Sequence, residues 1–341
     1  MSVDFDSLTD TILARCEVLA LCSDEPDRLT RTFLRPSVHR AHDLLTGWMR
    51  QAGLEVRRDA IGNLFGRAGR LGPAEASVFI VGSHIDTVPD AGKYDGVLGV
   101  LLGIAAAESL QGRTFRRALD VVAFSEEEGI RYKTPYLGSR AVCGRLDPAM
   151  LEIQDADGVT LEQAIRDFGL KPDEVAVAAY APGQGAGYFE PHIEQGPILE
   201  ALNISLGVVE AIAGQSRVWL HFIGRSGHAG TLPMELRRDA LCAGSEFVSE
   251  VERVARKTEG LRATVGSFMI APGAVNVVPG SVLLSLDVRH ATDEVRTKIV
   301  GELFEKARSI SGERKLELEI NPAANIGSKS LRSASWRSCD S

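Results

Sequence analysis

Short apolar runs that end in polar clusters alternate with an apolar helix in the first half of the chain. Residues 78–81 form a continuous apolar run that ends in Gly-Ser-His, and residues 119–124 form a second run that ends in Ser-Glu-Glu-Glu. Runs of this length predict buried strands of a parallel sheet. Residues 96–110, between them, are rich in glycine and alanine and predict a helix that packs closely on that sheet. We therefore expect an α/β domain with a mostly parallel sheet flanked by helices, followed over residues 155–187 by one short amphipathic helix and an irregular connection.

The second half of the chain has a different order of elements. Its apolar positions predict a strand to about residue 224, a helix over 233–257, strands over 261–270 and 281–289, a helix over 293–310 and a strand over 315–320. Both helices place apolar residues at three-to-four spacing. The order βαββαβ predicts a smaller, ferredoxin-like domain over residues 207–322, after a first domain over residues 1–206. Residues 323–341 form an atypical tail, and its serine-rich part, residues 327–341, is predicted to be disordered.

Composition and charge narrow the class of protein. Of the 341 residues, 44% are hydrophobic and 25% are charged, which is typical of a globular protein of about two domains. The formal net charge of −8, without a long basic run, argues against nucleic acid or an anionic membrane as a partner. Asp4, Asp6 and Asp10 stand where a secretory signal needs positive charge, and the longest apolar stretch, residues 97–107, is too short to span a membrane. Five scattered cysteines form no disulfide or metal-binding pattern, so we expect a soluble protein of the reducing cytoplasm.

Polar residues follow both predicted strands of the first domain, and ligands of such sheets bind beyond the carboxyl ends of the strands. The segment GSHIDTVPDAGKYDG contains His84, Asp86 and Asp95. Taken singly, each has a structural explanation: Asp86 caps a turn, Asp95 caps the next helix, and His84 is a satisfied polar residue. Taken together they suit a metal ion better. His84 can donate an imidazole nitrogen to zinc, Asp86 can hold the other ring nitrogen, and Asp95 offers a carboxylate.

Three consecutive glutamates, Glu126 to Glu128, follow the second strand in the segment FSEEEGIRY. Such a run is more often a solvated face, but the apolar strand before it and the glycine after it predict a tight turn into a crevice. Like charges in a crevice need cations to neutralise them. One glutamate would then bind a metal ion while its neighbour acts as general base.

Further candidate residues lie in later segments of the chain. They are His192, Glu194 and Gln195 in FEPHIEQGP, His228 in RSGHAGTLP, Asn276 in VNVVPG and Arg289 in DVRH. A lone histidine in such a segment would usually be structural. Asparagine and arginine suit recognition of a carboxylate, because a guanidinium fork matches that anion.

Together these segments resemble those of dinuclear metallopeptidases of the aminoacylase and carboxypeptidase-G type. Within that superfamily the chain resembles the branch of allantoate amidohydrolases and N-carbamoyl-L-amino-acid hydrolases. The resemblance covers about residues 10–322, and its motifs occur in the family's order: GSHIDTVPDAGKYDG, EEEGIRY, HIEQGP, GHAGTLPM, VNVVPG and DVRH. It implies a zinc-peptidase-like catalytic domain over residues 1–206, a dimerisation or lid domain over residues 207–322, and a homodimer.

The resemblance also implies a metal centre with two divalent ions. His84 and His192 would bind one ion, Asp95 would bridge both ions, and Glu128 would bind the second. Zinc, manganese and cobalt all suit such a mixed oxygen and nitrogen site.

Catalytic and substrate-binding roles follow from the same resemblance. Glu127 would be the general base, Asp86 would orient the histidine ligand, and His228 would reach across the dimer to stabilise the oxyanion. The residues implied in substrate binding are Gln195, near the ureido group, and Arg217, Asn276 and Arg289, at the substrate carboxylate.

The implied reaction is hydrolysis of a linear C–N bond in a small ureido acid. The strings IAGQSRVWLHFIG, GHAGTLPM and YLGSRAV are closer to allantoate amidohydrolases. Allantoate would then give a ureidoglycine or ureidoglycolate type of product with ammonia and carbon dioxide, a step of purine catabolism. An N-carbamoyl-L-amino-acid hydrolase is the alternative, and an inactive remnant that only dimerises is an alternative of a different class. Asn276 and Arg289 disfavour a plain aminopeptidase.

One family feature has no counterpart in this sequence. In the family, a segment that returns from the small domain carries the last histidine ligand of the second ion, whereas the last of the seven histidines here is His290. The resemblance ends near residues 320–322, and a truncation or frameshift would produce this pattern. We therefore expect the second ion to keep only Asp95 and Glu128 as ligands and to bind weakly, and hydrolysis to fall below family-like rates.

Overall fold

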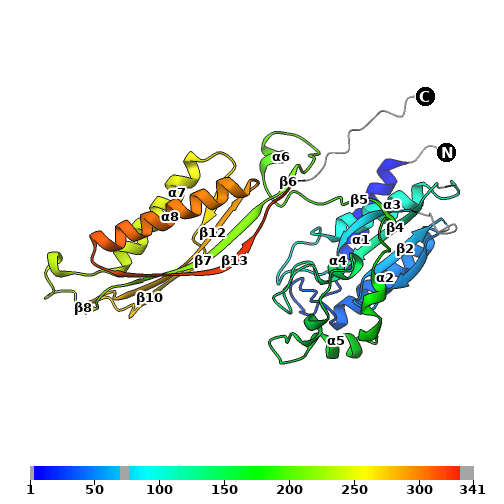
Figure 1. The fold of residues 1–341 in the computed structure, drawn as a ribbon. Helices are drawn as coiled ribbons and strands as arrows, with labels where there is room; N and C mark the ends of the chain where they lie inside the picture. The colour runs from blue at the N-terminus through cyan, green and yellow to red at the C-terminus, as the bar shows by residue number, and fades with distance from the viewer. Residues whose placement is uncertain (1–3, 70–76, 115, 331–341) are drawn as a thin grey trace. The chain divides into compact units, whose positions relative to one another are not determined.

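The computed structural model describes residues 4–69, 77–114 and 116–330, and it divides the chain into two compact units (Figure 1). The first unit spans Met1–Asn203 and the second spans Ile204–Ser341. Each unit has hydrophobic core clusters of its own. Among the described residues, no helix is long and apolar enough to cross a membrane.

The first unit is built on a five-stranded mixed sheet in the order β1-β2-β4-β3-β5. Its strands are β1 (Glu55–Arg58), β2 (Leu64–Ala68), β3 (Val78–His84), β4 (Ala118–Phe124) and β5 (Gly185–Phe189). Strand β3 is parallel to β4 and to β5, which confirms the parallel pair predicted from the two apolar runs. The β1–β2 hairpin adds two antiparallel pairings at one edge and makes the sheet mixed, and neither this hairpin nor β5 was predicted.

Helices of this unit pack mainly on one face of the sheet. The helices of the unit are α1 (Phe5–Ala20), α2 (Pro36–Gln51), α3 (Val97–Ser109), α4 (Leu137–Val142), α5 (Leu161–Asp167) and α6 (Ile198–Ala201), with 3-10 turns at Pro148–Glu152 and Pro172–Ala178. The main core joins α1, α2 and α3 to one face, with Cys16, Leu45, Ile104 and Val121 fully buried. The smaller core on the other face contains Phe65, Val122 and Val142. The glycine-rich helix α3 therefore lies directly on the sheet, as its composition predicted.

The second unit confirms the βαββαβ prediction. Its sheet has the order β10-β12-β7-β13, with every pairing antiparallel, and β9 pairs with β12 next to β10. The elements are β7 (Gly214–Ile223), α7 (Ala240–Lys257), β9 (Arg262–Thr264), β10 (Phe268–Ala271), β12 (Ser281–His290), α8 (Asp293–Glu313) and β13 (Glu317–Ile326). Val218, Leu220 and Phe222 of β7 are buried in the core with residues of α7 and α8. The alternate positions of β7, which include Arg217 and Trp219, belong to the other face of the sheet.

Helix α7 begins later than predicted. The Asp239 carboxylate accepts hydrogen bonds from the backbone N–H groups of Leu241 and Cys242, which starts the helix at Ala240. Within the predicted helix, Met234–Leu236 instead form a 3-10 turn. The residues before position 233 include the short strand β8 (Gly227–His228), which pairs with β11 (Val277–Val278).

The chain stays ordered beyond Pro322. Strand β13 continues to Ile326 with a register shift between Pro322 and Ala324, because proline has no N–H for the ladder. Lys329 and Ser330 form β14, which pairs with β6 (Ala211–Ile212). The prediction of disorder is therefore wrong for residues 327–330, and residues 331–341 lie outside the described part of the chain.

Candidate metal centre

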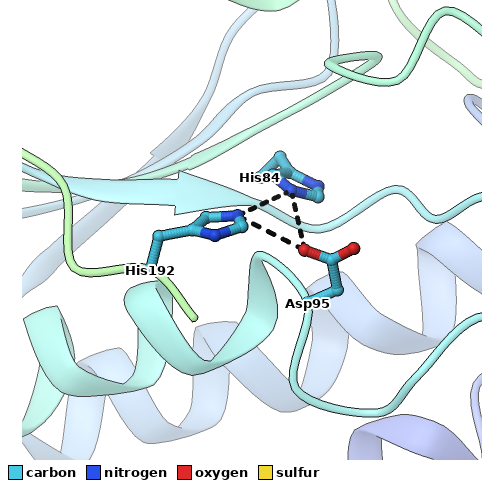
Figure 2. Close-up of side chains that lie close together, drawn as sticks. All are labelled: His84, Asp95 and His192. Carbon is cyan, nitrogen blue, oxygen red and sulfur yellow. Dashed lines mark hydrogen bonds and ion pairs between the residues drawn. The ribbon is translucent and has the colours of Figure 1, made fainter. Parts of the chain in front are cut away.

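Two histidines and an aspartate converge at the carboxyl end of the first unit's sheet (Figure 2). His84 is the last residue of β3, His192 follows β5, and Asp95 lies in the loop before α3. The His192 Nε2 atom lies 3.3 Å from Asp95 Oδ1, and the His84 Nε2 atom lies 3.8 Å from the same oxygen. The two Nε2 atoms are 3.4 Å apart. Three potential ligand atoms thus surround one point.

Backbone carbonyls orient both imidazole rings. The Nδ1 atom of His84 lies 2.9 Å from the carbonyl oxygen of Asp86, and the Nδ1 atom of His192 lies 2.9 Å from the carbonyl oxygen of Ile193. A carbonyl only accepts hydrogen bonds, so in each neutral ring Nδ1 carries the proton and Nε2 presents its lone pair. Histidine ligands of metals are commonly held in this way. The sequence predicted that the Asp86 side chain would hold His84, but its carboxylate lies 3.9 Å away and the carbonyl makes the hydrogen bond.

The Asp95 carboxylate supplies a test of whether a cation fits here. Its Oδ1 atom is buried and accepts no hydrogen bond within the described part of the chain, while it faces the two histidine nitrogens. Its Oδ2 atom accepts a hydrogen bond of 2.8 Å from the Gln195 side chain. A buried carboxylate oxygen without a donor is unfavourable, and a divalent ion held by Asp95, His84 and His192 would satisfy it. Asp95 makes no side-chain cap on α3, so the structural explanation of this residue is wrong.

Two glycines at the start of α3 make room for this cluster. Gly96 has φ +66°, and a Cβ atom there would lie 2.6 Å from three atoms of the His84 ring. A Cβ atom on Gly99 would lie 2.1 Å from the carbonyl oxygen of Pro191, the residue before His192. Both positions therefore require glycine for the histidines to approach the helix.

The second polar cluster is a strained turn after β4. Glu126 has φ +46°, an uncommon conformation for a residue other than glycine. The two carboxylate oxygens of Asp86 accept hydrogen bonds of 3.0 Å from the backbone N–H groups of Glu127 and Glu128. Asp86 therefore joins the His84 loop to the glutamate turn. Its carboxylate fixes the glutamate turn and its carbonyl fixes the histidine ring.

The glutamate turn brings a second set of possible ligands to His84. Ligand atoms of His84, Glu127 and Glu128 all lie within 4.8 Å of one another. Burial raises the pKa of Glu127 to about 7, which the charge of His84 opposes and the charges of Glu128 and Asp86 reinforce. Burial likewise raises the pKa of Glu128. For Glu126 burial, together with the charge of Asp86, raises the pKa to about 8. Carboxylates crowded in this way attract divalent cations.

Buried polar residues that the sequence analysis did not select hold the two loops in place. The Arg31 guanidinium donates to the carbonyls of Ile85, Leu19 and Cys22, which ties the His84 loop to the end of α1. The Asn63 side chain accepts a hydrogen bond from the backbone N–H of Ser125, at the end of β4, and donates one to the carbonyl of Gly138. No short motif marks these residues. The available signal was the string DAIGN, whose polar residues lie between apolar neighbours.

The second unit places its predicted residues in two separate groups. Arg217 and Arg289 both contact Asp287, with Nε to carboxylate distances of 3.0 Å, and border a pocket of about 590 Å³ that Trp219 also lines.

Asn276 belongs to the second group and lies near His228, because the Asn276 carbonyl accepts a hydrogen bond from the Ala229 N–H. Strand β12 separates the two groups, since Arg289 is near its end and Asn276 precedes its start. At about 3.3 Å per residue, the strand spans more than 20 Å. Within one chain, therefore, Asn276 does not join the two arginines.

Comparisons with known proteins give consistent matches. The model of Peptidase family M20/M25/M40 matches residues 80–324. An N-carbamoyl-L-amino acid amidohydrolase from Geobacillus stearothermophilus is 38% identical over 319 residues, which cover 91% of this chain and 77% of that protein. An allantoate deiminase from Arabidopsis thaliana is 36% identical over 339 residues, which cover 92% of this chain and 64% of that protein. The crystal structure of a hydantoinase/carbamoylase family amidase from Burkholderia ambifaria superposes with a TM-score of 0.87 at 30% identity, covering 95% of this chain and 80% of that one. The chain thus spans less than two thirds of the plant protein's length.

Proposed function

Because the chain belongs to peptidase family M20/M25/M40, we propose that it is a metal-dependent amidohydrolase that cleaves a linear C–N bond in a small ureido acid. The observation that carries this proposal is the convergence of His84, Asp95 and His192 around a buried carboxylate oxygen without a donor. The names of the relatives, which include allantoate deiminases and N-carbamoyl-L-amino acid amidohydrolases, support this class of reaction.

The metal centre of this proposal holds two divalent ions per subunit. His84, His192 and Asp95 would hold one ion, and Asp95 and Glu128 would take part in binding the second, with zinc, manganese or cobalt as the metal. Bound ions of this kind polarise a carbonyl and lower the pKa of water. Glu127 lies beside His84 and would accept the proton of the attacking water and return it to the leaving nitrogen.

The resemblance to the family supports substrate-binding roles for Gln195 in the first unit and for Arg217 and Arg289 in the second. Gln195 is close to the metal centre through Asp95 and would contact the ureido group. Arg217 and Arg289 lie side by side on Asp287 and would hold the substrate carboxylate. His228 and Asn276 lie together, away from the two arginines, which is compatible with a homodimer in which the partner copy supplies this pair.

Allantoate is the proposed substrate, and N-carbamoyl-L-amino acids are the alternative. The alternative has a specific basis, because several relatives at 36 to 41% identity are named N-carbamoyl-L-amino acid amidohydrolases.

The reducing cytoplasm is the compartment that we propose for this protein. The free thiols of the described residues, Cys16, Cys22, Cys143 and Cys242, are compatible with it.

Ammonia release by the full chain, loaded with zinc, manganese or cobalt, tests the proposal. We expect ammonia release from allantoate to be faster than hydrolysis of N-carbamoyl amino acids and of a dipeptide. Glu127→Gln is expected to lower kcat at least about 100-fold because it removes the base, while the ion proposed at His84, Asp95 and His192 stays bound. Metal-loaded protein that hydrolyses none of these compounds would contradict the proposal and favour an inactive, dimerising protein.

A further inference from the structure

His192 lies on a segment that the sheet does not hold. The register of β3 and β5 ends with the pair Val81 and Phe189, so the ladder stops three residues before His192. The segment nevertheless places the His192 Nε2 atom 3.3 Å from Asp95. Contacts outside the β3–β5 ladder must therefore hold His192 beside Asp95. Such contacts matter for metal binding, because a ligand that is held rigidly binds a metal ion more tightly than one on a mobile loop.

Glu190 makes such contacts. One of its carboxylate oxygens accepts a hydrogen bond of 2.7 Å from the hydroxyl of Ser83, a fully buried residue next to His84. The other oxygen accepts a hydrogen bond of 2.8 Å from the hydroxyl of Tyr188. Glu190 therefore joins the segment of one histidine to the strand of the other.

Helix α3 also lies against the segment. The carbonyl oxygen of Pro191 occupies the space that a side chain on Gly99 would need. The hydrogen bonds of Glu190 and the close contact of Pro191 with α3 together restrict the segment that carries His192.

We propose that Glu190 is a positioning residue for the metal centre, which acts by holding His192 in place through Ser83 and Tyr188. The inference rests on the metal centre of the proposed function and deepens it. A purely electrostatic role is the competing explanation, because the charge of Glu190 acts on Glu127 and would attract a cation without any effect on His192.

A double-mutant cycle in Zn²⁺ affinity separates these explanations. The affinity of the full chain for Zn²⁺ is measured by competition with a chelator in Glu190→Ala, in His192→Ala and in the double variant. Glu190→Ala alone is expected to weaken zinc binding about 10- to 100-fold, as loss of a residue that orients a ligand typically does. In the His192→Ala background, Glu190→Ala is expected to change zinc affinity less than about twofold, because the imidazole that Glu190 positions is absent.

Two further variants test whether misfolding or loss of charge explains a weaker zinc affinity of Glu190→Ala. Tyr188→Phe removes one hydroxyl and keeps the carboxylate, so a several-fold loss of affinity is expected without any loss of charge. Glu200→Ala removes a carboxylate from an exposed residue of α6 and is expected to leave zinc binding unchanged. Circular dichroism of each apoprotein checks that it is folded.

Three results would overturn the proposal. The first is wild-type zinc affinity in Glu190→Ala, and the second is wild-type zinc affinity in Tyr188→Phe. The third is an equal loss of zinc affinity when Glu190→Ala is made in the wild-type protein and in His192→Ala. Failure of the wild-type chain to bind zinc at all is a different result, because it would overturn the metal centre itself.

Discussion

At the scale of single residues, the space around the His84 ring decides whether the metal centre forms. Gly96 combines a positive φ with direct contact to the ring, so Gly96→Ala meets both backbone strain and overlap. We expect this variant to lower the free energy of unfolding by about 2–4 kcal/mol and to weaken zinc binding. Gly47→Ala in α2 is the matched control, because its Cβ meets no atom within 4 Å, and it is expected to stabilise the protein by up to about 1 kcal/mol. Urea unfolding and zinc titration of both variants measure these effects, and equal behaviour of the two would contradict the argument.

A buried histidine away from the metal centre gives the protein an acid-sensitive point. Burial lowers the pKa of His42 from 6.5 to about 3, and the nearby cations Arg58 and Arg31, with His39, act in the same direction. As the pH falls through 6.5, His42 therefore becomes protonated in the unfolded chain but stays neutral in the folded chain. The stability from neutral His42 is complete above pH 6.5 and is lost as the pH falls from 6.5 toward 3.

His42→Leu tests this point through the pH dependence of unfolding. One pKa unit corresponds to about 1.4 kcal/mol, so the wild type is expected to lose about 2 kcal/mol more than the variant between pH 6.5 and pH 5. Chemical unfolding at both pH values gives the difference, in which the titration of all other groups cancels. Parallel pH profiles for the two proteins would show that His42 does not contribute.

At the scale of elements, a polar network joins the β1–β2 turn to the end of β4 and thereby supports the glutamate turn. Asn63→Ala would leave the Ser125 N–H and the Gly138 carbonyl buried without their partner. We expect a loss of about 2–4 kcal/mol in the free energy of unfolding, since each such group costs about 1–3 kcal/mol. Thermal unfolding in the presence of EDTA measures this without any contribution from metal. A loss below about 0.5 kcal/mol, which is the usual effect of a surface substitution, would show that this network does not stabilise the protein.

Elements with a continuous apolar pattern were predictable, and elements defined by their neighbours were not. Strands β3 and β4 are apolar runs because they lie in the middle of the sheet, and α7 and α8 carry the periodicity of helices with one buried face. Strand β5 reads Gly-Ala-Gly-Tyr-Phe, lies at the sheet edge and is largely exposed, so it carries no such pattern. The same reasoning explains the site. His84 and Glu128 follow predicted strands, whereas Glu190 is defined only by its contact with Ser83, 107 positions away.

In the second unit, strand register rather than chain order decides which candidate residues of one chain lie together. Asn276 and Arg289 are close in the sequence, but the extended strand β12 between them places Asn276 before its start and Arg289 near its end. Arg217 and Arg289 are far apart in the sequence, and antiparallel pairing of β7 with β12 brings them to one carboxylate. Spacing along a chain predicts proximity within a loop or a helix, but across a sheet the register decides it.

At the scale of the whole molecule, the two units have separate cores, and the candidate metal ligands found among the described residues lie in the first unit. The buried residues of the main core of the first unit and those of the second unit form distinct clusters. A ligand that binds only the folded state stabilises the unit that binds it, by about 2.7 kcal/mol at 100 times its dissociation constant. We therefore expect calorimetry of the full chain to show two unfolding transitions, of which zinc raises only one.

Two variants assign the transitions. Phe247 is fully buried in the second unit, so Phe247→Leu is expected to lower the transition that zinc does not move. His192→Ala is expected to reduce the zinc-dependent shift and leave the other transition in place. If Phe247→Leu lowers the zinc-sensitive transition by the same amount, the two units unfold as one cooperative structure. Metal binding in the first unit would then also control the stability of the sheet that carries Arg217 and Arg289.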